Sequence, residues 1–290
     1  TEGATVAIQR VGIVGGGQMG GGVAEVTARS GLATVGREVS PEAAERSRSG
    51  IERSLGRALD RGKIDEATHQ AILDNLTFTT ELSDLSDCDL VVEAVIESFD
   101  LKAEIFAELD AIVTSPDAIL ATNTSSIPII DIAMATDRPD HVVGLHFFNP
   151  APVMALVEVI PSVRTDPSVT EQVTAFATDV LGKTVVAAKD RAGFVVNMLL
   201  VPYLLGAMRM FEDGHATAED IDTGMTLGAG HPMGPLTLSD LIGLDTMLLV
   251  GETLQAEYGD PASAPPALLR RMVAGGHLGR KTGRGFYDYS

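Results

Sequence analysis

Residues 11–20 read VGIVGGGQMG, a short apolar stretch followed at once by a glycine-rich turn. The spacing of Gly15, Gly17 and Gly20 lets a chain turn tightly after a strand and bring helix N–H groups against a pyrophosphate. Glu38 follows a second strand-like stretch, eighteen residues after Gly20, where a carboxylate accepts hydrogen bonds from ribose hydroxyls. The strand, the turn, the helix and the distal acid together predict a dinucleotide site rather than a merely structural glycine turn.

The composition is that of an acidic globular protein. The 290 residues, 45% of them hydrophobic, exceed one average domain, so we predict two domains. A net charge of −19 argues against a nucleic-acid partner, because a phosphate backbone requires a basic face. Any polyanionic small ligand must therefore find local lysines or arginines. The single cysteine, Cys88, excludes an intrachain disulfide and indicates a reducing cytoplasm.

No segment of the sequence predicts a membrane partner. Residues 1–10 lack a cationic stretch followed by an apolar run, so we expect neither a secretory nor a transit signal. Phe194–Phe211 has nearly the length of a membrane span, but Asn197, Pro202 and Arg209 interrupt it. We expect a helix buried at a subunit or domain interface there, in a cytoplasmic protein.

The first two thirds of the chain alternate strand-like and helix-like segments. This alternation predicts a Rossmann-like α/β fold, a doubly wound, mostly parallel sheet with helices on both faces. A long polar helix is expected over Pro41–Arg61, and an apolar stripe at helical spacing predicts another over Leu101–Val113. The expected strands are residues 11–14, Ala33–Glu38, Leu90–Glu93, Ala118–Thr122, His141–His146, Val157–Ile160 and Thr184–Ala187.

Beyond Asp190 the apolar runs lengthen and the strand signals vanish, which predicts a second, all-helical domain. Gly- and Pro-rich breaks at Gly228–Pro235 and Gly259–Pro266 separate its helices. No repeat or long linker precedes it, so the boundary is expected within Ala188–Gly193. We therefore predict a dinucleotide-binding domain over residues 1–190 and a helical C-terminal domain over residues 191–290.

Polar residues after the strands are the candidates for chemistry, since ligands of doubly wound sheets lie beyond the carboxyl ends of the strands. Asn123–Ser126 follows one expected strand, and His146–Pro150 follows the next. Glu158 lies inside the strand after that, and Asn197 opens the helical domain within an apolar run.

His146 and Glu158 are more informative together than apart. A lone histidine between apolar neighbours is more typical of a core than of a catalyst, and a carboxylate in an apolar strand must be paired if it is buried. A His146–Glu158 pair resolves both points, because the carboxylate fixes the imidazole tautomer and stabilises the imidazolium formed during proton transfer. Ser125 and Asn197 keep two interpretations each: Ser125 caps a helix, Asn197 bonds backbone, or both contact substrate.

These motifs together resemble the 3-hydroxyacyl-CoA dehydrogenase family, in particular its short stand-alone bacterial members that act on 3-hydroxybutyryl-CoA. The resemblance covers essentially the whole chain. The motifs that carry it are Gly15–Gly20, Val91–Ala94, Asn123–Ser126, His146–Pro150, Asp190–Asn197, His231–Pro235, Gly243–Asp245 and Lys281–Tyr287.

The resemblance implies an oxidoreductase that interconverts (S)-3-hydroxybutyryl-CoA and acetoacetyl-CoA by hydride transfer with NAD(H), and no metal. It implies that His146 is the general acid–base and that Glu158 orients it. It also implies that Ser125 and Asn197 hydrogen-bond the oxygen on the third carbon of the substrate.

Further contacts follow from the same resemblance. Ser54 and Arg61 match positions that contact CoA, whereas Arg57 and Lys63 are either additional phosphate ligands or ordinary solvated charges. The apolar character of the helical domain, with the family resemblance, predicts a homodimer formed through it. The residues implicated in cofactor contacts are Gly15, Gly17, Gln18, Met19, Gly20, Glu38, Glu97, Lys102, Ser125 and Asn149.

The sequence departs from the family pattern at several positions. Gly36 should weaken the second strand and loosen the adenosine edge, whereas Gly16, where alanine is common, should matter little. Arg37 beside Glu38 leaves NADP open as a cofactor, since an arginine binds a 2′-phosphate that a carboxylate repels; NAD is favoured. Ala155, where relatives often carry lysine, removes a positive charge near the proposed site.

Three other functions share this fold. An L-gulonate-type sugar-acid dehydrogenase is one, but the cationic residues within Pro41–Lys63 favour an acyl-CoA. A β-hydroxyacid dehydrogenase with a lysine base is disfavoured, because the His146–Glu158 pair fits that role. A non-catalytic NAD-binding structural protein has no need of all four catalytic candidates.

Overall fold

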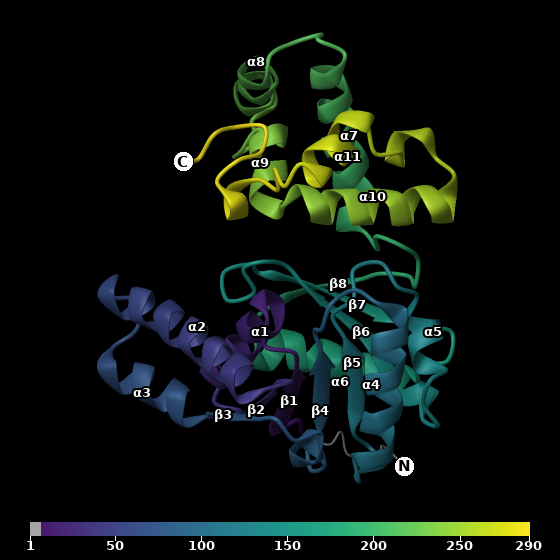
Figure 1. The fold of residues 1–290 in the computed structure, drawn as a ribbon. Coiled ribbons are helices and arrows are strands. Elements are labelled where there is room, and N and C mark those ends of the chain that lie inside the picture. Colours follow the sequence, from purple (N-terminus) through teal and green to yellow (C-terminus); the bar gives the residue numbers. More distant parts are fainter. Residues whose placement is uncertain (1–6) are drawn as a thin grey trace. The chain divides into compact units, whose positions relative to one another are not determined.

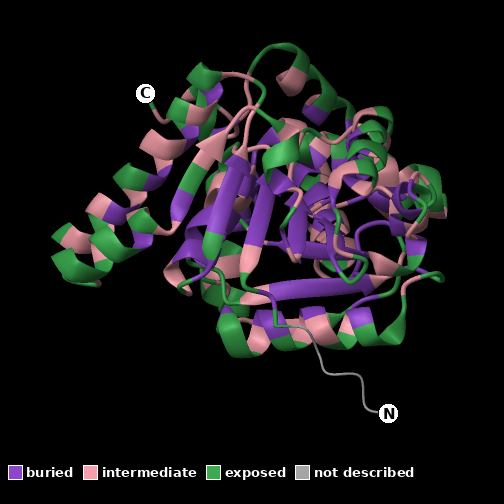
Figure 2. Cartoon of the chain, turned by 90° about the horizontal axis from the view of Figure 1, so that it is seen from below, coloured by how far each residue is buried: buried purple, intermediate pink, exposed green. Residues whose placement is uncertain are grey.

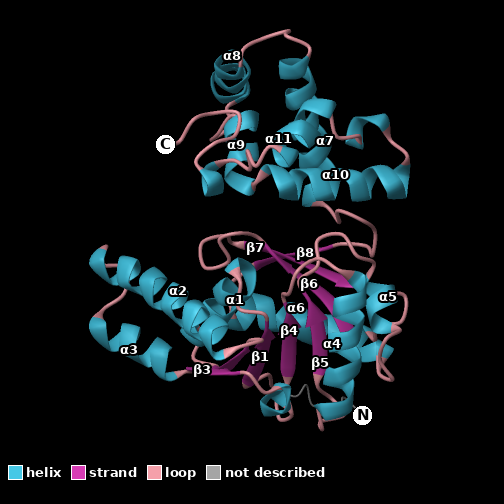
Figure 3. Cartoon of the chain, viewed as in Figure 1, coloured by secondary structure: helices cyan, strands magenta, loops and turns pink. Residues whose placement is uncertain are grey.

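The structure, a computed structural model, describes residues 7–290, which form two compact units that divide between Asp190 and Arg191. Figure 1 traces the chain through both units, and Figure 3 shows that unit 1 combines strands with helices while unit 2 is built of helices. Residues 1–6, on which most of the expectation about a leader segment falls, lie outside the described residues.

Unit 1 contains an eight-stranded sheet with the order β3-β2-β1-β4-β5-β6-β7-β8. The first six strands in that order run parallel, whereas β7 is antiparallel to β6 and parallel to β8. The predicted doubly wound, mostly parallel sheet is therefore confirmed. The strands are β1 (Arg10–Val14), β2 (Ala33–Arg37), β3 (Leu76–Thr79), β4 (Leu90–Glu93), β5 (Ile119–Thr122), β6 (Val142–Phe147), β7 (Leu156–Pro161) and β8 (Thr184–Ala187).

The central strands form the core of unit 1. Every residue of β4, β5 and β6 is buried, and Figure 2 shows the buried strands at the centre of this unit. Helices flank the sheet and begin at recognisable caps, such as Ser40, which accepts the Ala43 N–H ahead of Pro41. The helices are α1 (Gln18–Arg29), α2 (Pro41–Asp60), α3 (Glu66–Asp74), α4 (Phe99–Ile112), α5 (Ile129–Ala133) and α6 (Pro167–Ala175), which a π-helical turn (Phe176–Val180) extends.

Gly36 does not interrupt β2, and the looser adenosine edge expected from it stays a prediction. Gly36 pairs with Ile13 of β1 on one side and with Phe78 of β3 on the other. A Cβ at residue 36 would lie 2.6 Å from the Phe78 ring, which the Arg48 guanidinium covers at 5.4 Å from the ring centroid. The glycine is needed because the Phe78 ring occupies the space above it.

Unit 2 packs its helices around an apolar core of its own. Leu204 and Leu205 of α7, Leu236 of α9 and Leu254 of α10 are completely buried. Among residues 7–290, no helix combines the length and the apolar character that crossing a membrane requires. The helices are α7 (Val196–Glu212), α8 (Ala218–Thr223), α9 (Pro235–Ile242), α10 (Leu244–Tyr258) and α11 (Ala267–Ala274).

Candidate active site

Most of the candidate residues of unit 1 follow strands that are neighbours in the sheet. Strands β1, β4, β5 and β6 lie side by side and run parallel, so the segments after them meet at one edge. The glycine turn follows β1, and Glu97 lies beyond β4. Ser125 follows β5 by three residues, and His146 lies at the end of β6. The Asn123 Oδ1 accepts the Phe147 N–H at 2.9 Å and so joins the segments that follow β5 and β6.

His146 and Glu158 form a buried pair across the antiparallel strands. They are directly opposite in the β6–β7 register, so their side chains lie on one face of the sheet. His146 Nδ1 lies 2.7 Å from Glu158 Oε2, and the two residues are 7% and 0% exposed. The Glu158 carboxylate accepts a hydrogen bond from the protonated Nδ1 of His146. The neutral imidazole then carries its lone pair on Nε2. This arrangement is typical of a histidine that serves as general acid–base and is held in orientation by a carboxylate.

Lys102 lies in the first turn of α4, close to the segment that follows β4. Its side chain is 1% exposed, with Nζ 2.7 Å from Glu93 Oε1 and 3.4 Å from Glu97 Oε2. Glu93 is itself fully buried and also accepts the Thr122 hydroxyl at 2.8 Å. The Lys102 ammonium is thus committed to two carboxylates, and its contact with a cofactor stays a prediction.

Glu97 shapes the loop that carries Ser125. Its Oε1 accepts the N–H groups of Ser125 and Ser126 at 3.0 and 3.1 Å, and the Thr124 hydroxyl at 2.5 Å. Burial by itself raises the pKa of Glu97, but the Lys102 ammonium and these hydrogen bonds outweigh it and hold the pKa below its ordinary value. Glu97, which is ionised at neutral pH, therefore fixes the Ser125 backbone at the strand edge.

The turn between β1 and α1 has the shape that a pyrophosphate needs. Gly15 has a φ of +89°, and a Cβ at Gly20 would overlap the Gly15 carbonyl oxygen, so both positions require glycine. Nothing lies within 4 Å of a Cβ built at Gly17, which leaves the backbone open to a ligand. Gly17 caps α1 without a side-chain hydrogen bond, so the first N–H groups of the helix are available to an anion.

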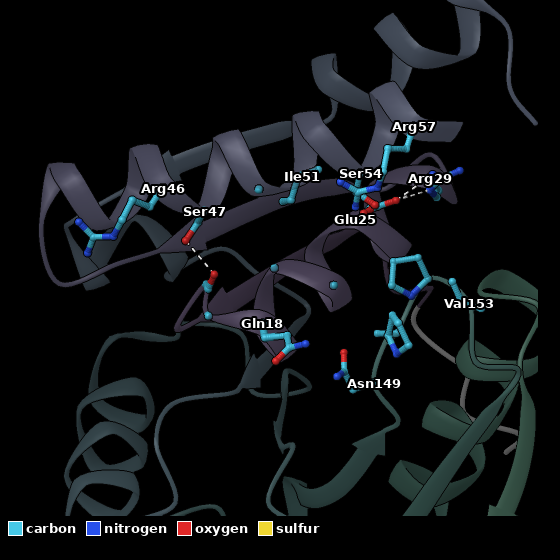
Figure 4. A pocket seen from close by; sticks show the side chains of 18 of the residues that line it. Gln18, Glu25, Arg29, Arg46, Ser47, Ile51, Ser54, Arg57, Asn149 and Val153 are labelled. Carbon is cyan, nitrogen blue, oxygen red and sulfur yellow. Dashed lines mark hydrogen bonds and ion pairs between the residues drawn. The ribbon is translucent and has the colours of Figure 1, made fainter. Parts of the chain in front are cut away.

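A cleft of about 870 Å³ extends from this turn between α1, α2 and the loop after β6 (Figure 4). It brings together six of the predicted residues. The predicted residues of unit 1 that are not in its lining are Gly15, Met19, Gly20, Glu97, Lys102, Ser125, His146 and Glu158. Asn197 belongs to unit 2, where it lies in the first turn of α7. The six residues are Gly17, Gln18, Glu38, Ser54, Arg61 and Asn149.

The lining of the cleft carries a positive net charge, whereas the whole protein is negatively charged. Five basic and two acidic side chains line it, although the protein carries a net charge of −19. Among residues 7–290, only Arg29 of the five makes an ion pair, with the buried Glu25 at 2.8 Å. Such a local excess of cations suits a polyphosphorylated ligand. The five basic residues are Arg29, Arg46, Arg57, Arg61 and Lys63.

Comparison with known families accounts for nearly the whole chain. Residues 10–191 match the model of the 3-hydroxyacyl-CoA dehydrogenase NAD binding domain, and residues 193–289 match that of the 3-hydroxyacyl-CoA dehydrogenase C-terminal domain. The chain belongs to the 3-hydroxyacyl-CoA dehydrogenase family. The resemblance inferred from the motifs is thereby confirmed, as is NAD as the cofactor.

Individual members of the 3-hydroxyacyl-CoA dehydrogenase family are similar along their full length. A 3-hydroxybutyryl-CoA dehydrogenase of Mycobacterium tuberculosis is 54% identical over 98% of this chain and 99% of its own. The crystal structure of M. tuberculosis FadB2 has a TM-score of 0.97 at 54% identity, covering 98% of this chain and 100% of that one. The (S)-3-hydroxybutyryl-CoA dehydrogenase PaaH1 of Ralstonia eutropha has a TM-score of 0.92 at 44% identity, with the same coverage.

One expectation drawn from the family pattern is wrong. Gly16 was expected to matter little in place of the alanine common in 3-hydroxyacyl-CoA dehydrogenases. A Cβ at residue 16 would clash with Ser47 Oγ and would lie 2.7 Å from Glu38 Oε1 and 2.8 Å from Ser47 Cβ. The Ser47 hydroxyl can rotate away, but its Cβ is fixed to the backbone of α2, so alanine at this position requires a rearrangement.

Sequence reasoning missed two residues that support the cleft of this dehydrogenase. Ser47 of α2 bonds the glycine turn, and Lys183 donates to the carbonyls of Ala151 and Met154 at 2.8 and 2.7 Å, fixing the loop after β6. Burial lowers the pKa of Lys183. Neither residue belongs to a motif, and the two residues between the π-helical extension of α6 and Lys183 give no signal of a contact made in three dimensions.

Proposed function

We propose that this protein interconverts (S)-3-hydroxybutyryl-CoA and acetoacetyl-CoA with NAD(H), and that His146 is its general acid–base. The observation that carries the proposal is the buried His146–Glu158 pair, 2.7 Å apart, at the same sheet edge as the glycine turn. The family membership and the similar enzymes named 3-hydroxybutyryl-CoA dehydrogenase support the substrate class.

The protein groups contribute proton transfer and charge stabilisation. NAD, when bound, supplies the hydride acceptor for oxidation and, as NADH, the donor for reduction. His146 takes the hydroxyl proton of the substrate at Nε2 during oxidation and returns it during reduction, while Glu158 stabilises the imidazolium. Ser125 and Asn197 donate hydrogen bonds to the oxygen on the third carbon, where negative charge develops.

The cationic cleft is proposed to hold the phosphates of CoA. Arg57, Arg61 and Lys63 lie near the end of α2 and line the cleft with Ser54. In an acidic protein, these cations supply the local positive potential that a CoA phosphate requires. Ser54 and Arg61 are the contacts that the family resemblance implies, and the surplus of cations favours Arg57 and Lys63 as further ligands over solvated charges.

We also propose that the protein is a cytoplasmic homodimer formed through unit 2. Leu199 and Leu227 are 73% and 83% exposed, and Leu241 and Leu249 are also exposed. Large apolar side chains exposed in this number are typical of an interface. Light scattering coupled to size-exclusion chromatography at micromolar protein concentration is expected to give the mass of a dimer, and a monomer would overturn the proposal.

The function is tested by the loss of NADH absorbance with acetoacetyl-CoA, beside NAD reduction with L-gulonate. We expect turnover with acetoacetyl-CoA and none with L-gulonate. A series of 3-ketoacyl-CoA substrates then gives the range of acyl lengths. Protein that binds NADH but turns over only L-gulonate would contradict the substrate class, and protein that turns over neither would support a structural role.

A further inference from the structure

Three segments meet at Glu38 in a way that the dinucleotide fingerprint does not require. Glu38 Oε1 accepts the Gly16 N–H at 2.8 Å and lies 2.7 Å from Ser47 Oγ, which is also 2.8 Å from the Gly16 carbonyl oxygen. The serine is 8% exposed and comes from α2, whereas Gly16 belongs to the turn after β1 and Glu38 follows β2. Ser47 projects from α2 towards the turn (Figure 4).

We propose that Ser47 is a positioning residue for cofactor selection, which holds Glu38 so that the protein takes NAD(H) and rejects NADP(H). The inference rests on the proposed dehydrogenase function. The single hydrogen of the Ser47 hydroxyl lies between Glu38 Oε1 and the Gly16 carbonyl oxygen, and the ionised carboxylate is the stronger acceptor. Because Oε1 accepts from both Ser47 and the Gly16 N–H, and Glu38 lines the cleft, Oε2 is the oxygen presented to a ligand. A carboxylate fixed in this place accepts bonds from the ribose hydroxyls and repels a 2′-phosphate.

Gly16 is part of the same arrangement. A Cβ at residue 16 would occupy the place in which Ser47 Oγ and Glu38 Oε1 meet, since it would clash with the former and lie 2.7 Å from the latter. The contact between Ser47 and Glu38 therefore depends on a glycine at this position. Gly16→Ala should separate the two side chains without removing either of them.

The nearby arginines explain why a fixed carboxylate matters. Arg37 Nε donates to the Thr80 carbonyl at 3.3 Å, and Arg37 is not in the lining of the cleft. Arg46 does line the cleft, next to Ser47 and at the opposite end from Arg57 (Figure 4). Its cation would attract a 2′-phosphate once Glu38 is released, so the exclusion of NADP(H) depends on holding the carboxylate in place.

The experiment compares Ser47→Ala with Ser49→Ala, a control on the same helix whose hydroxyl bonds the exposed Glu45 at 3.2 Å. Dissociation constants for NADH and NADPH are measured by nucleotide fluorescence without acyl-CoA. We expect Ser47→Ala to weaken NADH binding about fivefold to tenfold, in line with one hydrogen bond, and to shift the NADPH-to-NADH preference by about tenfold. Ser49→Ala should match the wild type in both constants.

Turnover separates positioning from catalysis. At saturating NADH, the kcat of Ser47→Ala with acetoacetyl-CoA should stay within about twofold of the wild type. Gly16→Ala provides a second route and should shift the preference in the same direction, whether or not Ser47→Ala folds. Unchanged NADH affinity and preference in a folded variant would overturn this inference alone, whereas wild-type protein that binds no NADH would overturn the proposed function itself.

Discussion

Buried carboxylates have different partners in the two units. In unit 1, Glu158 faces the imidazole of His146 at the sheet edge. In unit 2, Asp240 is 1% exposed and accepts the N–H groups of Phe286 and Tyr287 at 3.0 Å each, together with the Tyr289 hydroxyl at 3.1 Å. A carboxylate bonded to backbone N–H groups holds the chain in place, whereas one bonded to a titratable ring at a strand end can serve proton transfer.

The structural role of Asp240 explains the family motif at residues 281–287. A Cβ at Gly285 would clash with the Asp240 carboxylate, and one at Gly279 would clash with the Asp240 carbonyl oxygen, so the segment can wrap Asp240 only with glycines there. Asp222 strengthens the same region, because it accepts the Leu236 N–H at 2.8 Å and the Tyr287 hydroxyl at 3.0 Å. The motif in residues 281–287 thus fixes the end of the chain.

The largest expected effect is on kcat, and it tests whether the histidine that faces Glu158 transfers protons. His146→Gln removes the proposed acid–base group and should lower kcat with acetoacetyl-CoA by on the order of 10²–10⁴, while the Kd for NADH stays unchanged. Steady-state kinetics and nucleotide fluorescence measure the two quantities. An equal loss of NADH affinity would indicate that the histidine is structural.

The next effect falls on stability rather than on turnover. Asp240→Ala leaves two partly buried N–H groups and a tyrosine hydroxyl without their acceptor, which should lower the free energy of unfolding by about 2–4 kcal/mol. Asp245→Asn, which affects an exposed ion pair with Lys281, is the control and should cost under about 1 kcal/mol. Urea unfolding followed by circular dichroism compares the two variants, and equal losses would refute the structural role of Asp240.

A smaller effect tests the cationic end of the cleft. Arg57→Gln should raise the KM for acetoacetyl-CoA by about threefold to tenfold, but should leave the KM for acetoacetyl-pantetheine, which lacks the nucleotide, unchanged. Arg53→Gln is the control, since Arg53 is exposed on the same helix and is not in the lining of the cleft. If both variants raise the KM equally, the effect is one of general charge and Arg57 is not a phosphate ligand.

The smallest effect concerns pH, and it has opposite signs in the two units. Because the pKa of Glu97 is lowered in the folded protein, its contribution to stability is complete above the unfolded pKa of about 4.3 and is lost as the pH falls through the folded pKa. Burial outweighs the hydrogen bonds of Asp240 and raises its pKa, so its contribution is complete below the unfolded pKa and is lost as the pH rises through the folded pKa.

Unfolding free energies at several pH values check this difference. The gap in stability between the wild type and Glu97→Gln should be constant above about pH 5 and should narrow in more acidic solution. The gap for Asp240→Asn should widen as the pH falls towards the unfolded pKa. Gaps that change with pH in the same direction for both variants would contradict the contrast between the two carboxylates.

The sequence predicted what depends on local pattern. Apolar strands, the glycine turn and the polar residues after the strands gave the sheet and most of the candidate site in unit 1. Strand β3 gave no clear signal, because Leu76 is its only buried residue. Helix α3, with Ile72 as its only buried residue, was missed for the same reason.

Most contacts between distant segments could not be predicted. The pairing of His146 with Glu158 was predicted from the chemistry of the two side chains, but the antiparallel register of β6 and β7 that puts them directly opposite was not. The clash of a Cβ at Gly16 with Ser47 depends on how α2 packs against the glycine turn, and no spacing in the sequence reports that.

The most direct test of the His146–Glu158 pair is a double-mutant cycle on kcat with acetoacetyl-CoA. Glu158→Gln alone should lower kcat by on the order of 10–10³, because the imidazolium loses its stabilising carboxylate. If the two residues act as one unit, His146→Gln combined with Glu158→Gln should be no slower than His146→Gln alone. Losses that multiply in the double variant would show that the two side chains act independently and would contradict the account.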